Sequence, residues 1–157
     1  MPRDLAVTEV MTTPVTTLTA DTTIEEAASL LVEADIGGAP VVDGSGRLIG
    51  LLDDSDLVLS EARLHAPTTI EILGAYIPLP GERRRFQDEL RQALGRTVGE
   101  VMEDDPPAVQ PDATVEDVAT LLHDRAVSRV AVVDAERQVV GIVSRGDLVR
   151  ALRRAQE

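Results

Sequence analysis

The sequence predicts a mixed α/β (α+β) protein in which two β-α-β-β-α repeats pack with pseudo-twofold symmetry and are joined by a helical connector. The first observation is an internal duplication, because residues 7–58 align without a gap on residues 98–149. The second is that each copy contains one helical and two strand-like hydrophobic patterns. The third is size: a unit of about fifty residues buries too little surface to be stable alone, so the copies are expected to pack sheet against sheet.

Each copy is expected to contain one amphipathic helix. The strings "DTTIEEAASLL" and "DATVEDVATLL" repeat apolar residues at helical spacing. Thr23 followed by Glu26, and Thr114 followed by Asp117, predict capping boxes at the two helix starts. The apolar faces are expected to be Ile24, Ala27, Ala28 and Leu31 in the first copy, and Val115, Val118, Ala119 and Leu122 in the second.

The second half of each copy is predicted to be a strand pair followed by a helix. "APVVD" and "RLIGLL" flank the turn "DGSG", and "RVAVVD" and "QVVGIV" flank "AER". A final helix is expected to begin near Asp56 and near Asp147, and an extended segment opens each copy. These patterns divide the chain into a first repeat over 1–62, a helical connector over 63–96 and a second repeat over 97–157.

The connector is too long and too apolar to be a plain linker, so we expect it to be ordered. One helix is expected to run to about His65, and a second, short helix to follow Thr69. Phe86, Leu90 and Leu94 form an apolar stripe at the spacing of a third helix.

The aromatic residues of the chain, Tyr76 and Phe86, both lie in this connector. They are interpreted either as anchors for a partner subunit or as contacts to the protein's own surface. The basic run 83–85 is expected to form a solvated helix face or, alternatively, to reach a phosphate in a cleft.

Composition excludes several classes of function. The absence of cysteine rules out disulfides, thiolate catalysis and most structural zinc sites, and His65 and His123 have no neighbours at metal-ligand spacing, so both are assigned to the surface. The net charge of −13 disfavours nucleic acid, although a local basic pocket can still bind a small anion. No apolar run is long enough to span a membrane, and the first residues do not resemble a signal peptide. We therefore expect a cytoplasmic protein that binds neither nucleic acid nor membrane.

The junction "GIVSRGD" is the strongest candidate site. A strand there meets a helix, and such a helix start offers unpaired backbone N–H groups to an anion. Ser144 and Asp147 supply a hydroxyl and a carboxylate, while Arg145 and Arg129 can add charge-assisted bonds to phosphate. The alternative is that Ser144 and Asp147 only cap the helix and the arginines are solvated.

The duplicated motifs resemble a tandem pair of CBS domains, a Bateman module. The resemblance rests on "VTEVM" and "VGEVM", "APVVD" and "VAVVD", and "GLLDDSD" and "GIVSRGD", and it covers residues 7–58 and 98–149. It implies a disc-shaped regulatory module with two clefts that bind adenosine-containing ligands, namely AMP, ADP, ATP or S-adenosylmethionine. It also implies a homodimer. We further expect that the module acts on an effector protein and requires no cofactor.

The resemblance implies a role for each junction residue. A serine or threonine followed three residues later by an aspartate places a hydroxyl near phosphate and a carboxylate near the ribose hydroxyls, as Ser144 and Asp147 would do. The resemblance also implies flat walls for the adenine base. The expected wall residues are Ala108, Val109, Val130 and Ala131 in the second copy, and Thr17, Leu18, Ala39 and Pro40 in the first.

The first copy departs from this pattern. Asp53, Gly38 and Asp54 stand where the second copy has Ser144, Arg129 and Arg145, and only Asp56 keeps the ribose-type carboxylate. A carboxylate near a phosphate costs a few kcal/mol at ~4 Å, so two unequal clefts are predicted, with the second copy's the stronger. The acidic cleft is alternatively expected to hold a divalent cation, a magnesium-bound nucleotide or an uncharged nucleoside.

Three functions therefore compete. The leading prediction is a regulatory module that senses an adenine nucleotide. The second is a structural dimerisation or protein-interaction module that binds no ligand. The third, an enzyme, is disfavoured because the sequence lacks a nucleophile with its base, a phosphate-cradling glycine loop and a metal cluster.

Overall fold

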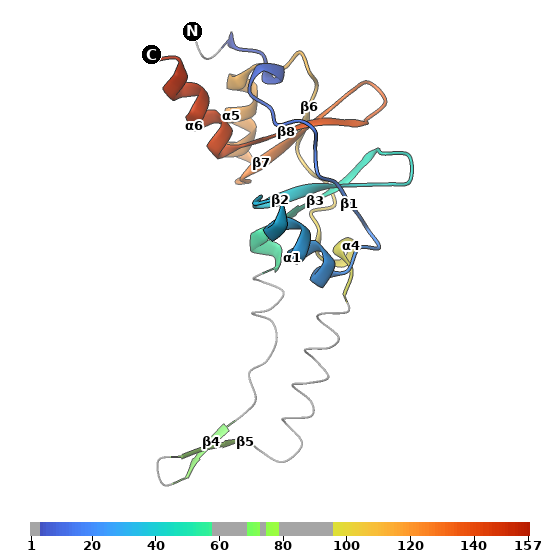
Figure 1. Ribbon diagram of the computed structural model, residues 1–157, viewed down its shortest axis with the longest axis vertical. Coiled ribbons are helices and arrows are strands. Elements are labelled where there is room, and N and C mark those ends of the chain that lie inside the picture. Colours follow the sequence, from blue (N-terminus) through green and yellow to red (C-terminus); the bar gives the residue numbers. More distant parts are fainter. Residues whose placement is uncertain (1–3, 58–68, 73–74, 79–95) are drawn as a thin grey trace.

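The computed structural model describes residues 4–57, 69–72, 75–78 and 96–157. Both repeats fold as the duplication predicts (Figure 1). In the first repeat the elements are the 3-10 helix η2 (Val7–Glu9), β1 (Leu18–Thr19), α1 (Ile24–Glu33), β2 (Gly38–Val42) and β3 (Leu48–Asp53). In the second repeat they are α4 (Val98–Val101), β6 (Ala108–Val109), α5 (Val115–Asp124), β7 (Arg129–Val133), β8 (Val139–Ser144) and α6 (Arg145–Arg154).

Each repeat forms a three-stranded sheet with the same topology. β1 runs parallel to β2, which is antiparallel to β3, and the order β6-β7-β8 repeats that arrangement. The register shifts between Val41 and Val42 and, at the equivalent place, between Val132 and Val133. The sequence repeat is therefore also a repeat of hydrogen bonding.

The helix starts follow the predicted local chemistry. The Thr23 hydroxyl accepts a hydrogen bond from the N–H of Glu26 at 3.1 Å, and the Glu26 carboxylate accepts one from the N–H of Thr23 at 3.1 Å. Thr114 and Asp117 form the same reciprocal pair. Both capping boxes are confirmed, and they satisfy backbone donors that the first helical turn would otherwise leave unpaired.

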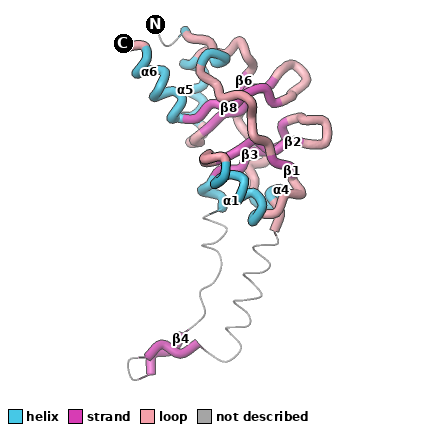
Figure 2. The backbone as a smooth tube through the Cα atoms, in the orientation of Figure 1, coloured by secondary structure: helices cyan, strands magenta, loops and turns pink. Residues whose placement is uncertain are grey.

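The two sheets face each other in the middle of the molecule and the helices lie outside them (Figure 2). α5 and α6 cover the outer face of the second sheet, whereas α1 and α4 lie beyond the first sheet (Figure 1). Leu48 of β3 packs with Ala131 and Val133 of β7, so the repeats share a small apolar layer. The expected packing of sheet against sheet is thus confirmed.

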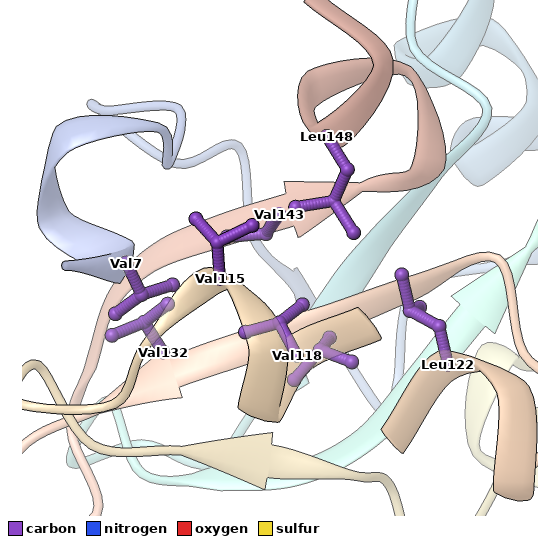
Figure 3. Close-up of a cluster of buried hydrophobic side chains, with 8 residues drawn as sticks. Val7, Val115, Val118, Leu122, Val132, Val143 and Leu148 are labelled. Carbon is purple, nitrogen blue, oxygen red and sulfur yellow. The ribbon is translucent and has the colours of Figure 1, made fainter. Parts of the chain in front are cut away.

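The repeats exchange their opening segments. Val7 lies in the second repeat's core with Val115 and Val118, as Figure 3 shows, and its N–H donates to the carbonyl of Ala113 at 2.8 Å. Val98 does the reverse, because it lies in the first repeat's core and its N–H donates to the carbonyl of Thr22 at 2.8 Å. Each helix-and-sheet unit is therefore completed by residues from the other sequence copy.

The methionines and glycines of the repeats show the same exchange. Met11 packs over Gly141 of β8, and Met102 packs over Gly50 of β3, so closely that neither glycine has room for a Cβ. Thr12 also pairs with Ile142, and Glu103 pairs with Leu51, as isolated antiparallel bridges. This close approach explains the glycine in the middle of each strand.

Some predicted details are wrong. Of the expected apolar helix positions, Ala28 is only half-buried and Ala119 is exposed, because a narrower stripe suffices to cover each small sheet. The segment after Thr69 is not a helix but a strand, β4 (Thr69–Ile72), which pairs antiparallel with β5 (Ala75–Pro78). Its β-branched threonine and isoleucines favour a strand over a helix.

The remaining connector predictions lie outside the described residues. They concern the helix to His65, the stripe of Phe86, Leu90 and Leu94, and the basic run 83–85. Tyr76 lies in β5, opposite Glu71. His123 is exposed on α5, which confirms its assignment to the surface.

Candidate functional site

The junction between β8 and α6 is a closed capping box. Ser144 is the N-cap residue, and its hydroxyl accepts a hydrogen bond from the N–H of Asp147 at 3.3 Å. Oδ2 of Asp147 accepts one bond from the Ser144 N–H at 2.8 Å and another from the Ser144 hydroxyl at 3.0 Å. The capping alternative is therefore realised in the structure, and it holds the Asp147 carboxylate in one orientation.

Asp147 also faces a cleft. It is buried, with an exposed fraction of 9%, and among the described residues it is the one charged residue in that class. Its second oxygen, Oδ1, pairs with the guanidinium of Arg150, three residues further along α6. A carboxylate fixed in this way at a cleft can accept hydrogen bonds from the hydroxyl groups of a ligand.

We call this depression the Ser144 cleft; its volume is about 420 Å³. That volume falls within the range of small-molecule sites. It is lined by Thr12, Pro14, Val15, Thr16, Ala34, Asp35, Ile36, Gly37, Gly38, Pro40, Arg129, Ile142, Ser144, Asp147 and Arg150. Residues from both repeats form it, so it exists only when the two sheets pack together.

Arg129 crosses from one repeat to the other within this cleft. It is the first residue of β7, and its Nε lies 3.5 Å from Oδ2 of Asp53 at the end of β3. Its terminal nitrogens lie over Gly37 and Gly38, where a Cβ would approach them to 2.8 Å. Only glycine leaves room for the guanidinium there. Arg129 therefore brings a largely buried positive charge to the wall of the Ser144 cleft.

The pseudosymmetric depression is acidic, and we call it the Asp53 cleft. Its volume is also about 420 Å³. It is lined by Leu51, Asp53, Ser55, Asp56, Glu103, Arg125, Ala126, Val127, Ser128 and Arg145. Three carboxylates and two guanidinium groups thus share one small depression.

The acids of the Asp53 cleft differ in their protonation equilibria. Burial alone would raise the pKa of Asp53, but hydrogen bonds from the Ser128 hydroxyl and the Ser55 N–H outweigh it and lower that pKa to about 2. A hydrogen bond with Asp53 raises the pKa of the neighbouring Asp54, which does not line this cleft. Burial raises the pKa of Asp56, and the negative charges of Asp53 and Glu103 add to that effect. The cleft therefore disfavours any further negative charge.

The structure brings some of the predicted binding residues together and separates others. Ser144, Asp147 and Arg129 meet in the Ser144 cleft, and Asp56 lies in the Asp53 cleft, as expected. Arg145 was expected beside Ser144 but lines the Asp53 cleft, where its guanidinium donates to the carbonyl of Val127 at 3.2 Å. The reason is geometric: the residue after a helix N-cap points about 100° away from its neighbour.

The predicted wall residues need a larger correction. Pro40 was predicted for the weaker site but lines the Ser144 cleft, because β2, which contains it, contacts β8 of the second repeat. Leu18, Ala39, Val130 and Ala131 are buried in the core, so their side chains present no surface to a ligand. Thr17, Ala108 and Val109 line neither cleft; Ala108 and Val109 pack against the hydrophobic clusters instead.

Several residues that line the clefts cannot be assigned to them from local sequence patterns. Thr12 and Thr16 lie in the exchanged opening segment, and no local signal assigns that segment to the other repeat. Glu103 reaches the Asp53 cleft for the same reason. Ser128 precedes β7, and its hydroxyl donates to Asp53 of the other repeat. Arg150 was detectable, because a residue three positions after Asp147 lies on the same helix face.

Two further findings bear on other classes of site. Within the described parts of the chain, no group of three or more histidine, cysteine, aspartate or glutamate side chains is arranged to hold a metal ion. Among the helices the structure describes, none is long and apolar enough to span a bilayer.

Comparison with known proteins adds independent observations. The sequence profile of the CBS domain matches twice, at residues 7–62 and 98–154. The chain is 30% identical to the uncharacterised protein MJ1426 of Methanocaldococcus jannaschii, over 84% of this chain and 82% of that protein. It is 34% identical to the chloroplastic CBS domain-containing protein CBSX1 of Arabidopsis thaliana, where the match covers 83% of this chain but only 56% of the relative.

Solved structures share the fold. The crystal structure of CBSX2 in complex with AMP superposes with a TM-score of 0.73 at 27% identity, covering 98% of this chain and 99% of the other. The CBS domain pair of MJ0100 in complex with 5′-methylthioadenosine and S-adenosyl-L-methionine superposes with a TM-score of 0.69 at 26% identity, covering 97% of this chain and 98% of the other.

Proposed function

Because the chain belongs to the CBS-domain family and contains the domain twice, we propose that it is a regulatory module that binds an adenosine-containing ligand in the Ser144 cleft. The similar structures of CBSX2 with AMP and of MJ0100 with S-adenosyl-L-methionine support this class of ligand. AMP, ADP, ATP and S-adenosylmethionine are the candidates, and no additional cofactor is required.

One observation carries the proposal: the buried Asp147 carboxylate and two arginine side chains, Arg129 and Arg150, line the same cleft. A carboxylate accepts hydrogen bonds from the vicinal hydroxyls of ribose, whereas guanidinium groups bind phosphate oxygens. Val15, Ile36 and Pro40 line the same cleft and supply apolar surface for a planar base. The set suits a nucleoside that carries at least one phosphate.

The Asp53 cleft is proposed to be the weaker nucleotide site. Asp53, Asp56 and Glu103 lie where a phosphate would have to sit, although Arg125 and Arg145 offset part of their charge. Unscreened repulsion of a few kcal/mol reduces affinity by more than tenfold. An uncharged nucleoside avoids that repulsion.

Thermal-shift measurements with AMP, ADP, ATP, S-adenosylmethionine, NAD and cyclic dinucleotides test the proposal. We expect at least one adenosine-containing compound to raise the melting temperature, because a ligand that binds only the folded state stabilises it. Asp147→Ala should abolish most of the ligand-induced shift, measured from the variant's own melting temperature, since loss of the cap also lowers stability.

Asp56→Ala is the matched control, because it removes the equivalent carboxylate of the other repeat. It should leave most of the shift intact. No shift with any compound, or an equal loss in both variants, would contradict nucleotide binding in the Ser144 cleft.

A ligand-free interaction module is the second candidate, because Val149 and Leu152 of α6 are 65% and 51% exposed and lie on one helical face. A second copy of the chain that covers this face would form the expected homodimer without any ligand. Light scattering on the wild type and on Val149→Asp tests it. A dimeric wild type and a monomeric Val149→Asp variant would support the interaction module, whereas a monomeric wild type would contradict it.

A further inference from the structure

Both oxygens of the Asp147 carboxylate have partners within the protein. Oδ2 accepts two hydrogen bonds from Ser144, from its N–H at 2.8 Å and its hydroxyl at 3.0 Å. Oδ1 accepts the guanidinium of Arg150. A ribose has two vicinal hydroxyls, and to bind both of them the carboxylate must use Oδ1, which is now paired with Arg150.

The two partners of Asp147 differ in how easily they can leave. Ser144 and Asp147 are joined through the helix cap, so their bonds are part of the fold. The Arg150 side chain is 63% exposed, so water can solvate its guanidinium when the pair with the buried carboxylate opens. Arg150 can therefore release Asp147 at low cost, whereas the carboxylate itself stays in place.

Arg150 also lines the Ser144 cleft, together with Arg129. We propose that Arg150 is a latch that makes this cleft select phosphorylated over unphosphorylated adenosine. The ribose hydroxyls displace the guanidinium from Oδ1, and the displaced guanidinium then pairs with the ligand's phosphate. An unphosphorylated nucleoside must break the same ion pair but offers the arginine no anion in return. This inference rests on the proposed function and adds its ligand specificity.

The other sequence copy lacks the latch. Leu59 stands at the position equivalent to Arg150, and the ribose-type carboxylate there, Asp56, accepts the N–H of Asp53 at 2.9 Å. A phosphate-selecting arginine is thus present only in the copy whose cleft also contains Arg129. Arg129 and Arg150 therefore both favour phosphate binding in the Ser144 cleft.

Isothermal titration of Arg150→Ala with AMP and with adenosine tests the inference. The AMP affinity should fall by about tenfold, the loss expected for one charge-assisted contact. The adenosine affinity should stay the same or rise, because Asp147 no longer has to be released. The ratio of the two affinities therefore falls by about tenfold or more.

Arg154→Ala is the matched control, since it removes the same charge from the exposed end of α6, outside the lining of the cleft. The ratio of AMP affinity to adenosine affinity in Arg154→Ala should equal that of the wild type. Alanine favours a helix, so both variants are expected to fold. AMP binding with an unchanged ratio in Arg150→Ala, or an equal change in both variants, would overturn the latch alone. A wild type that binds neither compound would overturn the proposed function and the latch with it.

Discussion

The Nε of Arg129 lies 3.5 Å from Oδ2 of Asp53, so the first residue of β7 forms an ion pair with the last residue of β3 across the two repeats. The duplication does not repeat this ion pair, because Gly38 occupies the position equivalent to Arg129 and Ser144 the position equivalent to Asp53. Arg129 lines the Ser144 cleft and Asp53 lines the acidic one. One interaction thus joins the repeats and separates two clefts of different charge.

Asp53→Asn should destabilise the protein by about 1 kcal/mol at neutral pH, because the carboxylate pairs with Arg129 and accepts the Ser128 hydroxyl. The pKa of Asp53 lies at about 2 in the folded protein, below its ordinary value of 3.8. A lowered pKa stabilises the fold above pH 4, and this contribution is lost as the pH falls towards 2. Urea denaturation of both proteins between pH 7 and 3 should show the difference shrink; a constant difference would contradict the assignment.

Gly38→Ala should cost about 2 kcal/mol of stability, as expected for overpacking at a buried strand. A Cβ there would lie 2.5 Å from the Leu52 carbonyl oxygen and 2.8 Å from a terminal nitrogen of Arg129. The control is Gly44→Ala, where a Cβ would meet no atom within 4 Å. In chemical denaturation, Gly38→Ala should have a lower midpoint than Gly44→Ala. Equal midpoints would contradict the expected overpacking at Gly38.

Asp56→Asn should stabilise the protein by about 0.5 kcal/mol at pH 7, with solvent screening keeping the effect small. Burial raises the pKa of Asp56 above 3.8, and the charges of Asp53 and Glu103 raise it further. A raised pKa means that stability decreases as the pH rises through it. The advantage of the variant should therefore disappear in acid, where Asp56 is protonated. Thermal melts at pH 7 and pH 4 provide the measurement, and a destabilised variant would contradict the assignment.

Val7→Ala and Val98→Ala should each cost about 2 kcal/mol, but in opposite repeats. Val7 packs with residues of the second repeat, and Val98 packs with residues of the first. Amide hydrogen exchange should show faster exchange in β7 and β8 for Val7→Ala, and in β2 and β3 for Val98→Ala. Loss of protection in the variant's own sequence copy would contradict the exchange of segments.

Local patterns predicted the elements well because local interactions create them. The capping boxes of Thr23 with Glu26 and Thr114 with Asp117 join residues three apart, and the strand pairs are closed by turns of a few residues. Thr69 shows the limit of this approach, because a short segment of mixed propensity was assigned to a helix and forms a strand.

Three features could be predicted from the residues alone: the duplicated architecture, the two strand-to-helix junctions and the pairing of Ser144 with Asp147. Each depends on sequence spacing or on contacts within four residues. Which residues share a cleft depends instead on how the two repeats pack together. Arg129 reaches Asp53, Arg145 turns to the opposite depression, and Thr12 joins the other repeat, because two sheets about ninety residues apart in the chain must pack face to face before these contacts exist.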